Sequence, residues 1–73
     1  MRVECFIRDS RVQFLFDEKM VVVKGCYEGN SILINYGDLV HNEYLNLDEL
    51  NAVMDAVKTY NKTNDVQICI VDY

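Results

Sequence analysis

The residues with types suited to covalent chemistry are one histidine, His41, and three cysteines. A nucleophile would need His41 as its base and a third group to orient that base. Cys5, Cys26 and Cys69 fall in segments that alternate like strands, where cysteine is usually a small buried hydrophobe. Their odd number and wide spacing suit neither a closed disulfide set nor a zinc site. We expect three free thiols; the enzyme alternative that stays open pairs His41 with Cys26 or Asp38.

Carboxylates are plentiful, but their spacing does not indicate acid–base catalysis. Asp48 and Glu49 are adjacent, yet neighbours on a helix point in different directions, and both suit the first turn of a helix. Glu43, Asp48 and His41 show no ligand repeat of the kind that zinc or calcium sites use. The three glycines are isolated, so no phosphate-binding loop is indicated. We expect no catalytic residue, no metal and no cofactor.

The acidic charge is concentrated in one segment. Residues 25–57, here called the acidic segment, contain six acidic residues and no lysine or arginine, whereas the rest of the chain carries seven basic and six acidic residues. Carboxylates interleaved with tyrosines suit binding to a basic protein surface by steering and aromatic contact. An ordinary solvated face is the alternative. The predicted partner-binding residues are Glu28, Tyr36, Asp38, Glu43, Tyr44, Asp48, Glu49 and Asp55.

The net charge of −5 disfavours direct binding of nucleic acid. In size and charge, the chain resembles phage-encoded inhibitors of host defence, such as anti-CRISPR and anti-restriction proteins. That resemblance implies a partner in the host cytoplasm that handles nucleic acid and therefore has a basic surface. Two alternatives stay open: a structural subunit of a larger assembly, and a homo-oligomer that sequesters a nucleotide or other small molecule. The sequestering site would use Arg2, Arg8, Arg11 or Lys24.

Length and composition predict a single domain, because 73 residues with 51% apolar side chains suffice for one small core. The first ten residues lack the apolar run of a signal peptide, and no apolar run, such as Met20–Val23, approaches the roughly 18 residues of a membrane span. We therefore expect a cytoplasmic protein without a membrane span.

Alternation of apolar and polar residues predicts strands at 2–8, 11–17, 31–36 and 66–71. The segment 19–27 is apolar on both sides, which favours a central strand covered on two faces, with a bulge at Gly25. Residues 39–45 are either a short edge strand or a loop. The order of elements is then four strands, a helix and a last strand.

The helix is expected to begin at Asn46, because Asn46 and Glu49 have the spacing of a capping box. Spacings of three and four give one apolar stripe over about 16 residues. The stripe consists of Leu47, Leu50, Val53, Met54, Val57 and Tyr60. We expect it to bury Val3, Ile7, Phe14, Phe16, Ile34 and Ile68.

These elements predict an α+β fold: an antiparallel sheet of four to five strands with one helix packed on one face. The opposite face would then expose Phe6, Leu15, Val22, Leu33 and Val71, to which Tyr73 could add. The simplest cover is a second copy, bound through this face or through an edge strand, which predicts a homodimer; a partner protein is the other candidate to cover this face. The alternative is that residues 39–45 fold back over it.

Overall fold

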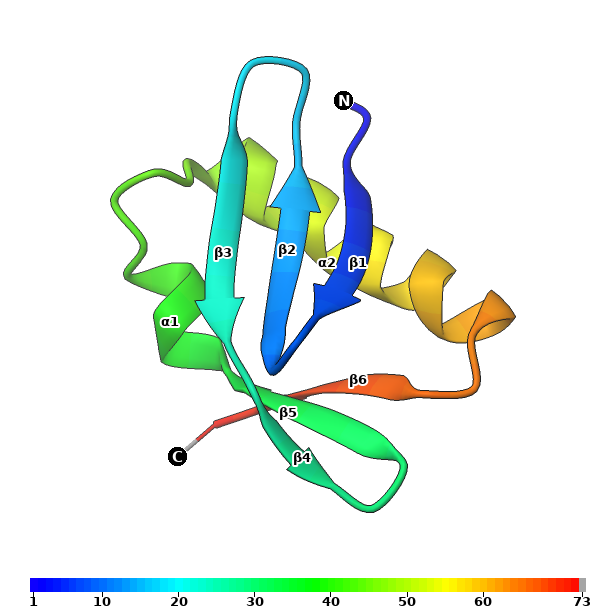
Figure 1. Ribbon diagram of the computed structural model, residues 1–73. Coiled ribbons are helices and arrows are strands. Elements are labelled where there is room, and N and C mark those ends of the chain that lie inside the picture. Colours follow the sequence, from blue (N-terminus) through cyan, green and yellow to red (C-terminus); the bar gives the residue numbers. More distant parts are fainter. Residues whose placement is uncertain (73) are drawn as a thin grey trace.

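The computed structural model describes residues 1–72 and confirms the α+β class, with two small sheets that share one main helix (Figure 1). Strands β1 (Glu4–Arg8), β2 (Arg11–Leu15) and β3 (Met20–Lys24) form an antiparallel sheet in that order. The second sheet contains β4 (Cys26–Glu28), β5 (Ser31–Asn35) and β6 (Gln67–Val71). Helix α1 (Tyr36–Val40) follows β5, and helix α2 (Leu47–Thr63) precedes β6.

The prediction of one antiparallel sheet is wrong in its strand pairing. Strand β4 pairs antiparallel with β5, but β6 pairs with β5 in parallel. Parallel neighbours need a crossover connection, and here α2 lies within it, so β5, α2 and β6 form a βαβ unit. Alternation shows that a segment is a strand but does not identify its neighbours, which is why the pairing was not predicted.

The strand predicted at 19–27 is interrupted at Gly25, where the chain leaves the first sheet for the second. A Cβ atom at Gly25 would lie 2.5 Å from Cγ1 and Cδ1 of Ile32, whose side chain is fully buried. The expected coverage of this strand on two faces is also wrong. β3 is an edge strand of its sheet; Val21 and Val23 are buried, while Met20 and Val22 are exposed.

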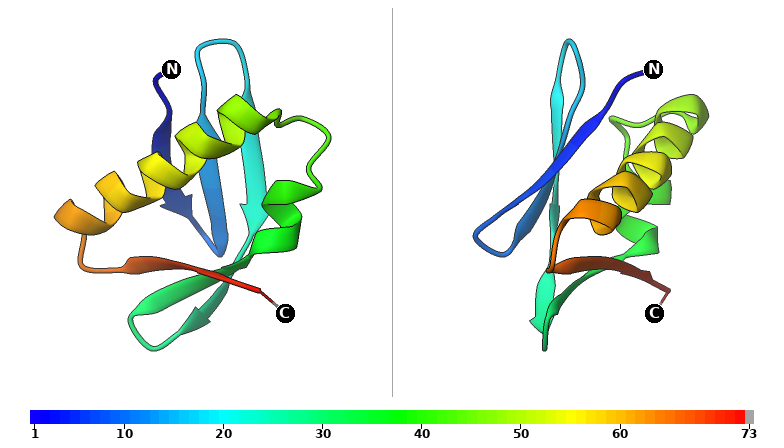
Figure 2. Two further views of the ribbon diagram at one scale, coloured as in Figure 1. Left: turned by 180° about the vertical axis from the view of Figure 1, so that it is seen from behind. Right: turned by 90° about the vertical axis from the view of Figure 1, so that its right-hand side faces the viewer.

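The core lies between α2 and the inner faces of both sheets (Figure 2). Leu50, Val53 and Val57 of the predicted stripe are buried, with Met54 and Tyr60 packed beside them. The six strand residues expected beneath the helix all belong to this core or pack against it. Leu47 is the exception, since it is the first residue of α2 and is 73% exposed.

Residues 39–45 are neither a strand nor a cover for the outer face of the first sheet. They comprise the end of α1 and the loop that leads to α2, on the same side of the sheet as α2. Leu39 is buried in the core and Leu45 packs against it. Helix α1 was not predicted; its cap is Asn35, whose Oδ1 accepts a hydrogen bond of 2.8 Å from the Gly37 amide.

The predicted capping box at the start of α2 is confirmed. Asn46 Oδ1 accepts from the Glu49 amide at 2.8 Å, and Glu49 Oε1 accepts from the Asn46 amide at 3.0 Å. The second carboxylate oxygen of Glu49 lies 2.7 Å from Lys19 Nζ. Lys19 also donates to the Tyr44 carbonyl at 2.6 Å, so the turn before β3 is tied to both the loop and the helix.

We predict that Gly25→Ala destabilises the fold by about 1 to 3 kcal/mol, because the added methyl group would overlap the buried Ile32 side chain. The matched control is Gly37→Ala on α1, where the nearest atom is a side-chain oxygen at 3.3 Å. Its effect should stay below about 1 kcal/mol. Urea unfolding of both variants measures the difference, and equal stabilities would contradict the close approach at Gly25.

We predict a pH-dependent contribution of Glu49 to stability. The hydrogen bond from Lys19, and then that from the Asn46 amide, lower the pKa of Glu49 from its ordinary value of 4.5. Because the folded pKa lies below the unfolded one, the ionised carboxylate stabilises the fold at pH values above 4.5. That contribution is lost as the pH falls through the folded pKa.

The measurement is the difference in free energy of unfolding between the wild type and Glu49→Gln, which keeps the hydrogen bond to the Asn46 amide but not the charge. The wild type should be the more stable protein at neutral pH, and the difference should shrink in acid. A difference that does not change with pH would show that the charge of Glu49 contributes nothing.

Candidate functional site

An open groove of about 830 Å³ runs between α2 and the segment that leads into and through β1. The C-terminal half of α2 extends beyond the edge of the sheet at β1, which leaves this space beside the strand (Figure 1). Ala52 and Ala56 leave space on the helix side of the groove, and Val3 and Cys5 line the strand side. The groove therefore combines a small apolar floor with an edge strand.

Two carboxylates line the helix side of the groove. Asp48 and Asp55 are seven residues apart on one face of α2, and Glu4 stands at the start of β1. Arg2 Nη2 lies 3.2 Å from Glu4 Oε1, so these two side chains form an ion pair. Among residues 1–72, no lysine or arginine pairs with Asp48 or Asp55. The helix side of the groove thus carries two unneutralised negative charges.

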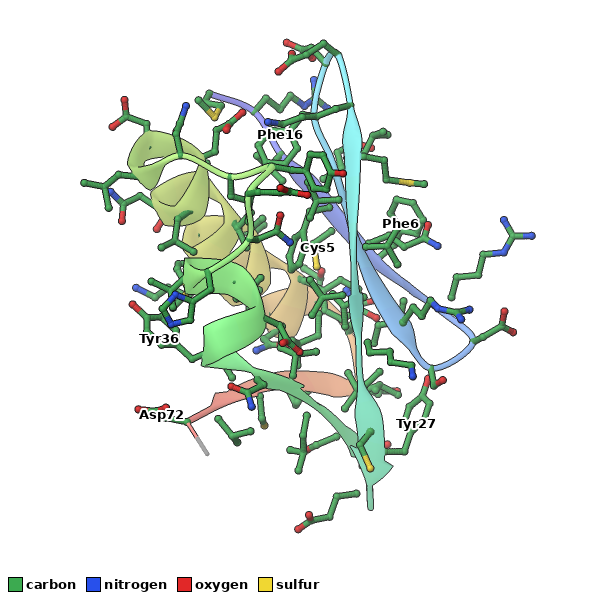
Figure 3. All side chains as sticks on the ribbon, turned by 90° about the vertical axis from the view of Figure 1, so that its left-hand side faces the viewer. Cys5, Phe6, Phe16, Tyr27, Tyr36 and Asp72 are labelled. Carbon is green, nitrogen blue, oxygen red and sulfur yellow. The ribbon has the colours of Figure 1, made fainter. Side chains whose placement is uncertain are left out.

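Cys5 lies where the groove meets the core, and its side chain is on the α2 side of the sheet (Figure 3). Burial raises the pKa of the Cys5 thiol to about 12. At neutral pH the thiol is therefore protonated and a poor nucleophile. Burial also raises the pKa of Tyr60, which lines the same groove.

The structure divides the predicted partner-binding residues among different places. Asp48 and Asp55 lie in the groove, whereas Glu28 lies at the end of β4, in the other sheet. Glu49 is only 7% exposed and is held by Lys19 and Asn46, so it has a structural role and is not part of the surface. Four residues are exposed on α1 and the loop that follows: Tyr36, Asp38, Glu43 and Tyr44.

The outer face of the first sheet exposes Phe6, Leu15, Met20 and Val22, each between 36% and 50% accessible. In the strand register, Phe6 is opposite Gln13, which is opposite Val22. Figure 3 shows Phe6 on this face, on the opposite side of the sheet from Cys5. Three of the residues predicted for self-association are therefore neighbours.

The remaining residues predicted for self-association are not on that face. Leu33 and Val71 belong to β5 and β6 in the second sheet and are half-buried. Tyr73 lies outside the described residues. The switch of the chain between sheets at Gly25 accounts for this separation, because it removes β5 and β6 from the first sheet.

The predicted ligand-holding cations fall into two groups. Arg8, Arg11 and Lys24 form one row across the first sheet, because Arg8 is opposite Arg11 and Arg11 is opposite Lys24. Arg2 lies at the other end of β1 and pairs with Glu4. Sequence reasoning did not find this row, although the two-residue turn at Asp9 and Ser10 contained the signal for its register.

The alternative catalytic pairs are not assembled by hydrogen bonds. His41 is the C-terminal cap residue of α1, and no hydrogen bond among residues 1–72 joins its ring to Cys26 or Asp38. The three thiols are free, with Cys26 exposed and the other two half-buried. In the same part of the chain, no three histidine, cysteine, aspartate or glutamate side chains are grouped to hold a metal ion.

No helix within residues 1–72 has the length and apolar character needed to cross a membrane. Comparisons of the chain with protein-family models, with curated proteins and with solved structures found no match.

Proposed function

We propose that this chain is a non-enzymatic binding protein whose acidic surface engages a basic surface on a partner protein. The observation that carries the proposal is the groove beside α2, in which Asp48 and Asp55 form no ion pair with any lysine or arginine of residues 1–72. Unpaired carboxylates on a concave surface attract and orient a cationic partner at small desolvation cost. A nucleic-acid-processing protein is the proposed partner class, and inhibition of such a protein, as in host defence, is the proposed role.

The exposed loop before α2 extends the proposed contact surface. Glu43 and Tyr44 lie in this loop, and Tyr44 is 65% exposed. A tyrosine ring beside carboxylates can pack against the aliphatic stem of a lysine or arginine. Its ring face can also make a cation–π interaction with the charged group. The loop is fixed in place by the bond from Lys19 to the Tyr44 carbonyl, so these groups need little ordering on binding.

We predict that reversing Glu43, Asp48 and Asp55 to lysine abolishes capture of the partner from the native host, while circular dichroism stays unchanged. The reason is that attraction to a basic surface becomes repulsion. The matched control reverses Glu28, Asp65 and Asp72, three exposed acidic residues in or beside the second sheet, and changes the net charge by the same amount.

The control separates a local contact from an effect of net charge. Our proposal requires that the control retains the partner and that increasing salt weakens capture by the wild type. Undiminished capture by the first variant, or equal losses in both variants, would overturn it.

We further propose that the outer face of the first sheet binds a second copy of the chain. Its apolar centre contains Phe6, Leu15 and Val22, and one end carries the row Arg8, Arg11 and Lys24. The opposite end carries Glu4 and, in the turn after β2, Asp17 and Glu18. Two such faces packed with opposite strand directions would bring the cations of each copy to the acids of the other.

The test uses two charge-reversed variants. Changing Arg8, Arg11 and Lys24 to glutamate, or Glu4, Asp17 and Glu18 to lysine, should each give a monomer in analytical ultracentrifugation. An equimolar mixture should form a heterodimer, because both contacts are then complementary again. A monomeric wild type, or a mixture that stays monomeric, would contradict this mode of self-association.

A further inference from the structure

The edge of β1 that faces the groove is unpaired. Strand β1 is the terminal strand of its sheet and, within residues 1–72, pairs with β2 alone. The bonds from Phe16 to Lys19 and from Gly25 to Ser10 show that the even-numbered residues along β2 bond toward β3. The odd-numbered residues of β2 must then bond to β1, and they are opposite Glu4, Phe6 and Arg8.

It follows that Cys5 and Ile7 direct their main-chain N–H and C=O groups away from β2, toward the free edge. No other hydrogen bond in the described part of the chain reaches these groups. The edge of β6 differs. There, the Asn61 side chain accepts from the Ile68 amide at 2.8 Å and donates to the Ile68 carbonyl at 2.9 Å, so that α2 occupies the edge.

The edge of β1 is also the one beside the groove. The overhanging half of α2 lies behind the position that a fourth strand would take, about 4.8 Å from β1. Ala56, where that half begins, leaves room there for the side chains of such a strand, and the neighbouring Asp55 offers a carboxylate to them. A helix and an edge strand that flank a groove are the elements used in peptide recognition by strand addition.

We propose that an extended segment of the partner, carrying lysine or arginine, binds in this groove as an added strand on β1. The inference rests on the proposed function and specifies its binding mode. Main-chain bonds to Cys5 and Ile7 would provide affinity, and alternate side chains would face α2, where Asp55, with Asp48 farther along the groove, selects cations. A single segment fits this position, whereas a second copy aligned edge to edge would bring its own α2 against the overhang of the first (Figure 1).

The test uses a short peptide in which lysine alternates with threonine, blocked at both ends, together with two N-methylated versions. One version is methylated on the main-chain nitrogen of every lysine, and the other on the main-chain nitrogen of every threonine. In an added strand only one of these sets faces β1. One methylated peptide should therefore bind at least about tenfold more weakly than the parent, and the other should bind nearly as well.

Hydrogen exchange measured by NMR gives a second readout in the same samples. Binding of the parent peptide should slow exchange of the Cys5 and Ile7 amides and change that of Phe6 little, since the Phe6 amide already bonds to β2. In the protein, Cys5→Pro removes one edge donor without breaking the bonds to β2 and should weaken binding. Cys5→Ala is its control and should not.

The outcomes separate this inference from the proposed function. Equal binding of both methylated peptides, with no protection of Cys5 and Ile7, overturns strand addition even if reversal of Asp48 and Asp55 abolishes binding. Loss of binding on reversal of Asp48 and Asp55 would still support the proposal that an acidic surface binds a basic partner. No binding of the parent peptide to the wild type overturns strand addition. The proposed function is overturned instead if the variant with reversed Glu43, Asp48 and Asp55 still captures the partner, or if that variant and its control lose capture equally.

Discussion

The fold depends on how closely the backbone at Gly25 approaches the side chain of Ile32. The chain passes here from β3 into β4 against the buried face of β5. Because this crossing leaves no space for a Cβ atom, it requires glycine. One core then forms beneath both sheets, and α2 covers it together with Leu39 of α1. Because α2 crosses two small sheets rather than one wide sheet, its C-terminal half extends past β1 (Figures 1 and 2). The groove is thus a consequence of dividing the strands between two sheets.

The placement of charge follows from the same packing. Lys19 is used internally, where it bonds to Glu49 and the Tyr44 carbonyl and lies 5.2 Å from the centre of the Phe16 ring. Lys19 therefore cannot neutralise the carboxylates in the groove. A surface with unpaired acids and an unpaired strand edge offers two kinds of binding group to one extended cationic segment.

Local patterns in the sequence predicted the local structure well. Alternation identified β1 and β2, the spacing of Asn46 and Glu49 identified the start of α2, and apolar spacing identified most of its buried face. The pairing of strands was not predictable in this way, because parallel pairing of β5 with β6 depends on contacts between residues far apart in the chain. Helix α1 was missed because its cap, Asn35, also ends a strand with a clear alternating pattern.

The candidate site was predictable only in part, for a related reason. The acidic segment is evident from the sequence, but the fold buries Glu49, moves Glu28 away and brings Asp48 and Asp55 to one groove. Ala52 and Ala56 on the groove floor could not be identified from the sequence, because alanine is common in helices whether or not it lines a groove. The free edge of β1 likewise became visible only when the order of strands was known.

The most direct test of the account is photo-crosslinking from single positions to the lysine–threonine peptide. A photo-reactive residue replacing Asn51 would lie in the groove, and one replacing Asn30 would lie at the exposed turn between β4 and β5. The account predicts that the peptide crosslinks from position 51 and not from position 30, and that reversal of Asp48 and Asp55 removes the crosslink. Crosslinking from position 30 alone, or equally from both positions, would contradict it.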